Sequence, residues 1–410
     1  MTSAEQDQGI SLPERRRLRR GVPLLTEADR ADVRTELLDV VEYRKSGLSV
    51  NWIVGCPLDC GYCVRHLFDN FEMKVPRAVM REPEAADLLL RHRFFQPHVT
   101  PIQLLNRATD PMLPSVKPHT YEMLRILDEQ GLTNHVLLIS RWRVEPGDCA
   151  ILNSFTNLKI TLLVTHSGID DTQVEPVDSK IAATSLRTAF EHAERYRVVL
   201  YWRPIVPGLN DTDAHIQRGL ALSGSAHATV FTGLFYKQQI RDYYRAHGLP
   251  EPYPDGARRK IFPEALEQRI LEAAAGQATG SPLFRKTSCA VAYAHRLADY
   301  NGHYGIRELC DICPTSQISR CAAAWKQPNR THLGLAVDKL GGRLVDLNAR
   351  AAVTEGLDEQ RRYLIQHSLG YQVHDLAKPH HHNRHGRADL GWPTPAPPTK
   401  ALPAQTGDPR

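Results

Sequence analysis

Long apolar runs are missing from this sequence of 410 residues. No stretch of 18 consecutive apolar residues occurs, which excludes a membrane-spanning helix of ordinary length. The first twenty residues, MTSAEQDQGISLPERRRLRR, contain a basic run but no apolar segment behind it, so no secretory signal peptide is expected. Both absences predict a cytoplasmic protein without a membrane partner.

A strong excess of one charge is missing as well. The sequence has 51 Lys and Arg against 46 Asp and Glu, a formal net charge of +5. This mild excess suits many enzymes with anionic substrates and does not require nucleic acid as a partner. The basic run at 15–20 leaves nucleic acid open as a partner, although such a run near a terminus is more often a solvated segment.

Apolar runs of strand length recur along the first 280 residues, and each is followed by a helical stretch. The runs are nearly continuous rather than alternating, as expected for parallel strands that are buried on both faces. Helical patterns at 120–131, which ends at Gly131, and at 180–196 are typical of the intervening segments. Periodicity alone leaves open a doubly wound sheet and a full or partial barrel. The predicted strands are 48–54, 100–106, 135–140, 159–165, 197–205 and 228–235.

The pattern changes beyond residue 280. The segment 281–330 has few strand signals and is rich in cysteine, and 331–376 contains a hairpin-like pattern around Gly341-Gly342 followed by a helix from about Leu357 to Leu369. The last segment is rich in proline and histidine, which predicts disorder. The expected units are a basic N-terminal extension (1–45), a barrel (46–280), a cysteine-rich extension (281–330), a small α/β element (331–376) and a tail (377–410).

The eight cysteines divide into two groups and the single residue Cys149, expected to be a small buried side chain. In a reducing compartment they favour metal binding or catalysis over disulfides. Cys56, Cys60 and Cys63 are spaced C-x3-C-x2-C directly after the first predicted strand. A structural zinc site closes its tetrahedron with four protein ligands. Three thiolates holding an iron–sulfur cubane instead leave one iron open, which suits chemistry rather than scaffolding.

The segment CPLDCGYC (56–63) resembles the radical S-adenosylmethionine enzymes in its cysteine spacing and in the aromatic Tyr62 before the last cysteine. In that family the three cysteines hold a [4Fe–4S] cluster, and S-adenosylmethionine chelates the fourth iron through its amino and carboxylate groups. Reductive cleavage of the sulfonium gives a 5′-deoxyadenosyl radical that abstracts hydrogen from the substrate. The resemblance implies an enzyme with a partial (βα)6 TIM-type barrel and an electron donor such as flavodoxin or ferredoxin.

Polar residues follow each predicted strand at its carboxyl end, where the active site of a parallel barrel lies. Some of them have a second interpretation. Asp110 before Pro111 also fits a helix N-cap. Arg203 is either a clamp for a carboxylate or the ion-pair partner of Glu175 or Asp170. The strand-end residues are Cys56, Asn106, Arg107, Thr109, Asp110, Ser140, Arg141, Thr165, His166, Ser167, Arg203, Tyr236 and Lys237.

A narrower resemblance, over about 50–235, is to the spore photoproduct lyase-like branch. RATDP (107–111), VEP (174–176), Arg187 and RPIVPGLND (203–211) carry it. The substrate is left open between nucleic acid, a peptide and a small metabolite. The resemblance implies that Thr109 and Asp110 lie near the methionine moiety, Ser140 and Thr165 near the ribose, Tyr62 against the adenine, and Arg203, the expected catalytic residue, near the carboxylate or the substrate.

A second group consists of Cys289, Cys310, Cys313 and Cys321. Four thiolates close either a zinc site or a [4Fe–4S] cluster, and C-x2-C followed by Pro314 resembles both zinc knuckles and iron–sulfur loops. An auxiliary [4Fe–4S] cluster is expected because several radical S-adenosylmethionine lineages append one, with zinc as the alternative. Were both groups structural zinc sites, the chain would instead be a nucleic-acid-binding module with strongly salt-dependent binding.

Overall fold

The computed structural model describes residues 21–254, 263–277, 279–377, 384–385 and 388–389. The basic run at 15–20 and most of the tail expected from residue 377 lie outside these residues. In the described part, no helix combines the length and the apolar character that crossing a bilayer requires.

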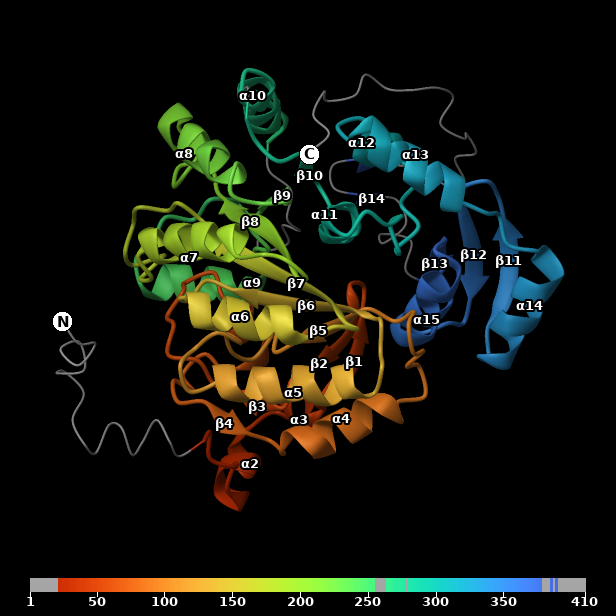
Figure 1. Cartoon of the computed structure of the whole chain (residues 1–410), viewed down its shortest axis with the longest axis horizontal. Helices are drawn as coiled ribbons and strands as arrows, with labels where there is room; N and C mark the ends of the chain where they lie inside the picture. Colours follow the sequence, from red (N-terminus) through yellow and green to blue (C-terminus); the bar gives the residue numbers. More distant parts are fainter. Residues whose placement is uncertain (1–20, 255–262, 278, 378–383, 386–387, 390–410) are drawn as a thin grey trace.

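One sheet of eight strands forms the centre of the molecule (Figure 1). Its strand order is the order of the chain, and every neighbouring pair from β2 onward is parallel, whereas β1 is antiparallel to β2. A doubly wound sheet reverses its order at a switch point, so this unreversed, open order confirms the partial barrel. The strands are β1 (Val41–Arg44), β2 (Gly47–Val50), β5 (Ile102–Leu104), β6 (His135–Ser140), β7 (Lys159–His166), β8 (Arg197–Ile205), β9 (Ala228–Gly233) and β10 (Leu283–Phe284).

The helices between these strands begin at residues suited to a helix start. The carboxylate of Asp178 accepts a hydrogen bond from the Lys180 N–H at the start of α7 (Ser179–Glu191), and Thr212 caps α8 (Asp213–Ser223) in the same way. Gly131 follows α5 with a positive φ of 69°, the conformation that glycine adopts most easily after a helix. The other helices along the barrel are α4 (Glu82–Leu90), α5 (Lys117–Glu129), α6 (Pro146–Ser154), α9 (Gln238–Ala246) and α10 (Glu264–Ala275).

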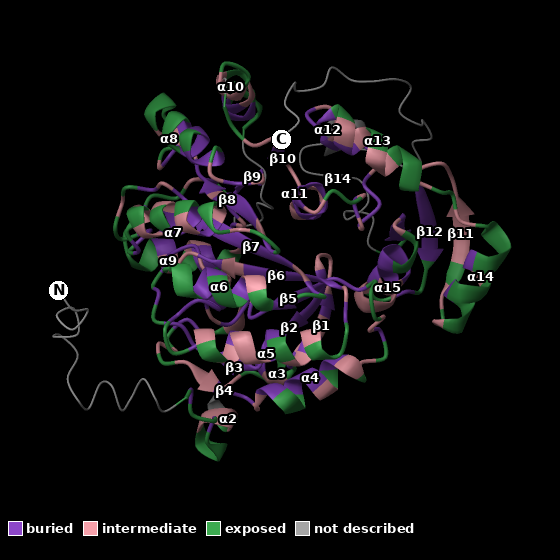
Figure 2. Cartoon of the chain, in the orientation of Figure 1, coloured by how far each residue is buried: buried purple, intermediate pink, exposed green. Residues whose placement is uncertain are grey.

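The two faces of the sheet are covered by different elements. Successive residues of a strand point to opposite faces. Leu138 and Leu162 pack in the largest core cluster together with buried residues of α5, α7 and α8. Leu137 and Leu163, one position along, pack in a second cluster with α11 (Thr287–Ala294). The cysteine-rich extension therefore lies against the face of the sheet that the barrel helices leave uncovered, and the strands between the two layers are buried (Figure 2).

The first predicted strand, 48–54, is broken, which corrects the expectation of one continuous strand. β2 ends at Val50, and Ile53–Val54 (β3) pairs antiparallel with Arg77–Ala78 (β4) in a separate ribbon. Between them the buried side chain of Asn51 donates to Ser49 Oγ at 2.6 Å and accepts from the Arg107 N–H at 3.2 Å. A hydrogen-bonded polar side chain thus interrupts the apolar run, and the segment that carries Cys56, Cys60 and Cys63 follows the ribbon.

The hairpin predicted around Gly341-Gly342 is also wrong, because its first arm is a helix, α14 (Arg330–Lys339). Asn329 caps α14 by accepting from the His332 N–H at 3.1 Å, and the turn at Gly341, with φ 78°, leads into β11 (Arg343–Leu347). β11 pairs antiparallel with β12 (Ala351–Glu355), and β12 pairs parallel with β13 (Gln372–Asp375). The helix expected at 357–369 is present as α15 (Glu359–Leu369).

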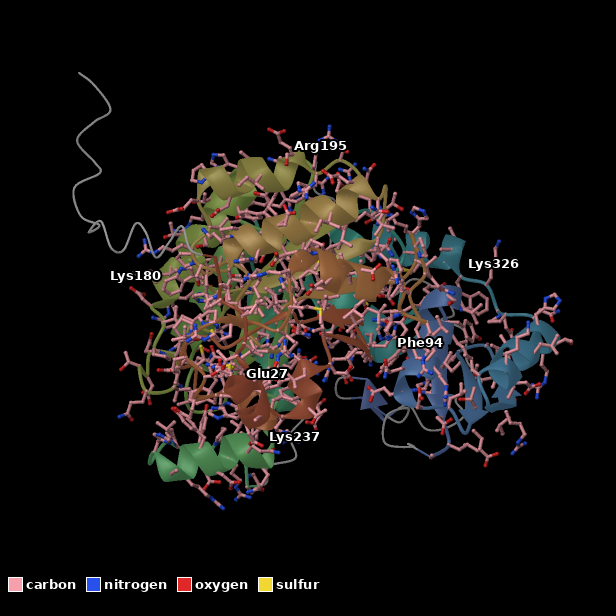
Figure 3. All side chains as sticks on the ribbon, turned by 90° about the horizontal axis from the view of Figure 1, so that it is seen from below. Glu27, Phe94, Lys180, Arg195, Lys237 and Lys326 are labelled. Atoms are coloured by element: carbon pink, nitrogen blue, oxygen red, sulfur yellow. The ribbon has the colours of Figure 1, made fainter. Side chains whose placement is uncertain are left out.

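The three-stranded sheet, α14 and α15 form a unit, here called the C-terminal unit, beside the main sheet (Figure 1). Figure 3 shows the molecule from below, with the exposed Lys180 and Arg195 on the barrel and Lys326 toward the C-terminal unit. The remaining described elements are α2 (Glu27–Asp32), α3 (Thr35–Leu38), the 3-10 helix η1 (Val64–Phe68), α12 (Arg307–Cys310), α13 (Thr315–Ala324), β14 (Arg384–His385) and β15 (Ala388–Asp389).

Candidate functional site

The first three cysteines lie on the loop between β3 and η1, here called the cysteine loop. Cys56 and Cys60 are 6% and 4% exposed, Cys63 is half-buried, and all three are free thiols. The N–H of Cys56 donates to the Met73 carbonyl at 2.9 Å. The N–H of Gly61 donates to the Val174 carbonyl at 2.9 Å, which joins the loop to the segment after β7.

Two further residues of this loop region have structural roles that were not predicted. Gly55 has a φ of 91°, and a Cβ atom there would lie 2.5 Å from the Val75 carbonyl oxygen, so the position before Cys56 requires glycine. Arg65 is 1% exposed and donates to the Leu58 carbonyl at 2.9 Å and to the Phe71 carbonyl at 3.0 Å. One guanidinium therefore ties the two sides of the loop together.

A buried network lies beside Cys60 and is centred on Glu175. The Glu175 carboxylate accepts hydrogen bonds from the Tyr62 hydroxyl, from Arg141 Nη1 at 2.6 Å and from Ser167 Oγ at 2.9 Å. Cys60 Sγ lies 3.7 Å from its other oxygen. Burial raises the pKa of the Cys60 thiol well above its usual value; Arg141 opposes the rise, whereas Glu175 and the other two cysteines add to it. The three thiols and this network thus share one environment.

Asp110 lies beside the same loop. Burial raises the pKa of Cys56 to about 11, and although Arg65 lowers it, the Asp110 carboxylate raises it further. That carboxylate accepts from Ser140 Oγ at 2.7 Å and from the Arg141 N–H at 2.9 Å. Burial raises the pKa of Asp110, while these hydrogen bonds lower it. No helix begins at Pro111, because α5 begins only at Lys117. Asp110 Oδ1 nevertheless accepts from the Met112 N–H at 2.9 Å, as a capping side chain does, while the carboxylate also bonds across to the end of β6.

Two threonines predicted from the strand ends lie in this region, Thr165 buried and Thr109 half-buried. Thr165, 4% exposed, pairs with Tyr201 in the β7–β8 register. In the described part of the chain, the Thr109 hydroxyl is buried without a hydrogen-bond partner. Burial lowers the pKa of His166 to about 4, so its ring is neutral at pH 7. A cleft is lined by Arg141, Thr165, His166, Ser167, Glu175, Val177, Asp178, Ser179 and Ala182.

Arg203 makes its contacts outside the Glu175 network. Its Nη1 donates to the Tyr201 hydroxyl at 2.8 Å, and its guanidinium lies over the Tyr201 ring, 4.7 Å from the centroid. The Tyr201 hydroxyl also accepts from Thr287 Oγ1 of α11 at 3.2 Å. Glu175 bonds Arg141 instead, and Asp170 bonds two residues of α8. Neither ion-pair partner considered for Arg203 is therefore correct.

The second cysteine group gathers around α11, α12 and α13. Cys289 lies on α11, Cys310 ends α12, Cys313 follows it, and Cys321 lies on α13; all are free thiols. Burial raises the pKa of Cys289 well above its usual value, and Asp299 and the other three thiols raise it further. The four cysteines, distant in sequence, therefore share one site.

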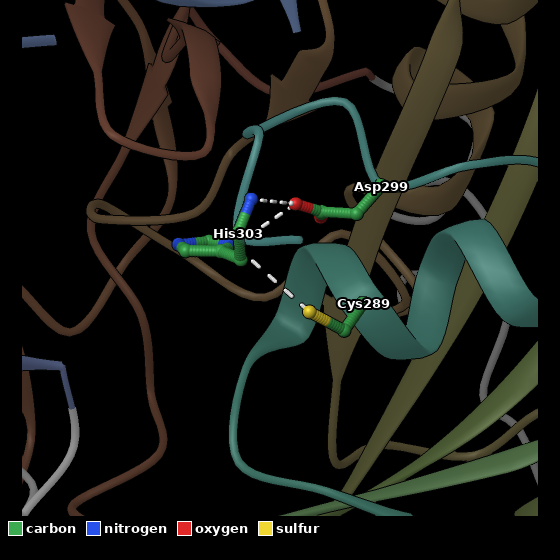
Figure 4. A group of neighbouring side chains, drawn as sticks. All are labelled: Cys289, Asp299 and His303. Atoms are coloured by element: carbon green, nitrogen blue, oxygen red, sulfur yellow. Dashed lines mark hydrogen bonds and ion pairs between the residues drawn. The ribbon is translucent and has the colours of Figure 1, made fainter. Parts of the chain in front are cut away.

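Two residues of the second site, Asp299 and His303, were not predicted (Figure 4). His303 Nδ1 lies 3.0 Å from Asp299 Oδ2 and 3.9 Å from Cys289 Sγ. Burial raises the pKa of Asp299, but the charge and the hydrogen bonds of His303 outweigh burial and lower that pKa to about 2. The signal available in the sequence was D-x3-H between the cysteines. Among the described residues, Cys289, Asp299 and His303 form the one group of three ligand-type side chains whose donor atoms all lie within 4.8 Å.

No protein-family model and no curated protein sequence matches the chain. Among solved structures, it is similar to a spore photoproduct lyase complexed with dinucleoside spore photoproduct, with a TM-score of 0.44 and 12% identity over 64% of this chain and 86% of that chain. It is also similar to Streptococcus suis SuiB bound to S-adenosylmethionine, with a TM-score of 0.39 and 9% identity over 62% of this chain and 54% of that chain.

Proposed function

We propose that this chain is a radical S-adenosylmethionine enzyme in which Cys56, Cys60 and Cys63 hold a [4Fe–4S] cluster. The observation that carries the proposal is the cysteine loop. It presents three free thiols beside the carboxyl ends of the parallel strands in a partial barrel, the end at which such barrels place their active sites. Three thiolates leave one iron of a cubane open to a small molecule.

The spacing of the thiols supports a cluster over a single ion. Two thiolates on one tetrahedral zinc ion are about 3.8 Å apart, because each Zn–S bond is about 2.3 Å long. Within the described residues, the only three-residue group gathered within 4.8 Å is Cys289, Asp299 and His303, so at least one sulfur pair in Cys56, Cys60 and Cys63 is wider than this. A cubane spreads its thiolates over separate iron atoms, which suits the wider spacing.

When bound, the cluster and S-adenosylmethionine together supply the 5′-deoxyadenosyl radical that removes a hydrogen atom from the substrate. The role of the protein is to bind and orient the cluster and S-adenosylmethionine and to shield them from water. Asp110 and Thr109 are proposed to hold the methionine moiety, because the Asp110 carboxylate is adjacent to Cys56 and the buried Thr109 hydroxyl has hydrogen-bonding capacity to offer. A carboxylate is a suitable acceptor for the amino group of methionine.

The cleft beside Glu175 is proposed to receive the adenosyl part. Thr165 lines this cleft, and Ser140, which bonds Asp110, ends the neighbouring strand, so both are proposed to lie near the ribose. Tyr62 is proposed to pack against the adenine, with its hydroxyl held by Glu175 and Arg141. Arg203, fixed on Tyr201, is proposed to bind a carboxylate or an anionic group of the substrate.

The second site is proposed to hold an auxiliary [4Fe–4S] cluster on Cys289, Cys310, Cys313 and Cys321. Four thiolates satisfy all four irons. Among the described residues, no three of these four sulfurs lie within 4.8 Å of one another, and the tighter group at this site consists of Cys289, Asp299 and His303. An external reducing partner completes the proposal. Nucleic acid, a peptide and a small metabolite are all compatible substrate classes.

The experiment is anaerobic reconstitution followed by metal analysis and an assay for 5′-deoxyadenosine with dithionite and S-adenosylmethionine. Wild-type protein should hold about eight irons and form the nucleoside, because two cubanes contain four irons each. Cys60→Ala should lose about four irons and all product. Cys149→Ala is the matched control, because Cys149 is a fully buried thiol on α6 outside both groups, and it should keep both properties. A colourless wild-type protein that holds only zinc would contradict the proposal.

A further inference from the structure

We propose that Asp299 and His303 are positioning residues of the second site, which donate hydrogen bonds to its cysteine sulfurs and thereby raise the reduction potential of the cluster bound there. The inference rests on the proposed function in one respect, namely that the second group holds an iron–sulfur cluster.

The segment from Asp299 to His303, here called the 299–303 loop, contacts three of the four sulfurs. The N–H of Asp299 donates to Cys321 Sγ at 3.4 Å. His303 Nδ1 lies 3.9 Å from Cys289 Sγ, and the His303 carbonyl accepts from the Cys310 thiol at 3.8 Å. A metal replaces the thiol proton of the last contact. The backbone N–H of Asp299 stays directed at Cys321, and the hydrogen on His303 Nδ1 is shared between Asp299 Oδ2 and Cys289 Sγ. One short loop thus places N–H groups beside two of the four sulfurs.

The Asp299 carboxylate fixes how His303 presents its ring. Asp299 Oδ2 accepts from the backbone N–H of His303 at 2.9 Å and faces Nδ1 at 3.0 Å. A carboxylate oxygen and a thiolate sulfur both accept hydrogen bonds, so a hydrogen on Nδ1 lies between Asp299 Oδ2 and Cys289 Sγ, which face the same edge of the ring (Figure 4). His303 is 1% and Asp299 is 8% exposed. Hydrogen bonds in such a buried environment are stronger than in water.

The C-terminal unit holds the 299–303 loop from the other side. Asn301 Oδ1 accepts from Gln366 Nε2 at 3.0 Å and lies 2.7 Å from His367 Nε2, both on α15. The Asn301 carbonyl accepts from the Gln372 side chain of β13. Gly302 packs so closely that a Cβ atom there would lie 2.5 Å from the Gly370 carbonyl oxygen. The loop is therefore set before a cluster arrives, as a positioning role requires.

Hydrogen bonds to the sulfurs of an iron–sulfur cluster stabilise its reduced form, which carries more negative charge, and so raise its reduction potential. Removal of the imidazole N–H should make the potential more negative. The backbone N–H of Asp299 persists in any side-chain variant, so a substitution at His303 isolates the contribution of the ring.

The test uses a parent variant with Cys56, Cys60 and Cys63 all changed to Ala, so that only the second cluster contributes. His303→Phe, His303→Gln and the control His332→Phe are added to this parent, since His332 is exposed on α14. EPR-monitored redox titration gives the potentials. Each variant should hold about four irons. His303→Phe should be more negative than the parent, His303→Gln, which keeps a side-chain donor, should lie between them, and His332→Phe should equal the parent.

The outcomes separate this inference from the function on which it rests. A parent without iron refutes the auxiliary cluster itself. A parent with iron whose potential is unchanged by His303→Phe overturns the role of His303. A strong nitrogen hyperfine coupling that disappears in His303→Phe would make His303 a direct ligand and overturn the inference too. If His303→Phe fails to retain iron, His303→Gln decides, because a potential equal to the parent overturns the inference and a more negative one supports it.

Discussion

The ion pair between Glu175 and Arg141 gives a sharp prediction for the stability of the site. The two side chains are 4% and 17% exposed, and Glu175 also accepts hydrogen bonds from Tyr62 and Ser167. Glu175→Leu leaves the Arg141 guanidinium without the carboxylate that accepts its hydrogen bond. Removing one partner of a buried pair costs about 3–5 kcal/mol of the free energy of unfolding, and the residual exposure of Arg141 places the expected cost near 3 kcal/mol.

The assay is urea unfolding of the cluster-free protein at pH 7. The control is the double variant Glu175→Leu with Arg141→Met, which removes both charges and should be more stable than Glu175→Leu alone, since an apolar replacement of a whole buried pair is often tolerated. The interaction energy follows from the double-mutant cycle. A loss below about 1 kcal/mol in Glu175→Leu, the value typical of exposed pairs, or strict additivity in the cycle, would refute the reasoning.

Two further predictions concern the backbone before Cys56 and a buried histidine. Gly55→Ala should reduce the iron content and destabilise the protein by about 1–3 kcal/mol, because φ is 91° and the new Cβ would meet the Val75 carbonyl. The control is Gly147→Ala, whose new Cβ would have no atom within 4 Å, and it should change neither property. Metal analysis and urea unfolding measure the two properties. Burial lowers the pKa of His135 to about 3, so protonation favours the unfolded chain and the stability from this group is lost as pH falls below about 6.5. The free energy of unfolding should therefore fall less between pH 7 and pH 5 in His135→Phe than in the wild type, by up to about 1.4 kcal/mol per pH unit. Urea titrations at the two pH values measure this difference, and an unchanged pH dependence would contradict the assignment.

The barrel strands could be predicted where a strand is buried on both faces, because such a strand has a continuous apolar sequence. β6 and β8 have the predicted bounds, 135–140 and 197–205. The break in the first predicted strand could not be foreseen, because the hydrogen bonds of Asn51 to Ser49 and Arg107 depend on residues brought together only by folding. The Gly341-Gly342 turn fits a helix–strand junction as well as a hairpin, and the N-cap at Asn329 decides between them.

The candidate site shows the same division. Three cysteines on one loop are a local pattern, visible in sequence. The partner of Asp110 is Ser140, and the partner of Glu175 is Arg141, and both pairs join different strand ends. Asp299 and His303 reach the second site through tertiary contacts: the C-terminal unit bonds their loop at Asn301, and the Asp299 N–H bonds Cys321 Sγ. Contacts between distant segments leave no periodic pattern in the sequence, so they could not be predicted from it.

The most direct test of the central claim isolates the first cluster. A variant with Cys289, Cys310, Cys313 and Cys321 changed to Ala should still hold about four irons. The measurement is the EPR spectrum of this reduced protein with and without S-adenosylmethionine. If the cofactor binds at the open iron of a cluster on Cys56, Cys60 and Cys63, its addition should change the spectrum. A spectrum that S-adenosylmethionine leaves unaltered, or a variant without iron, would contradict the account.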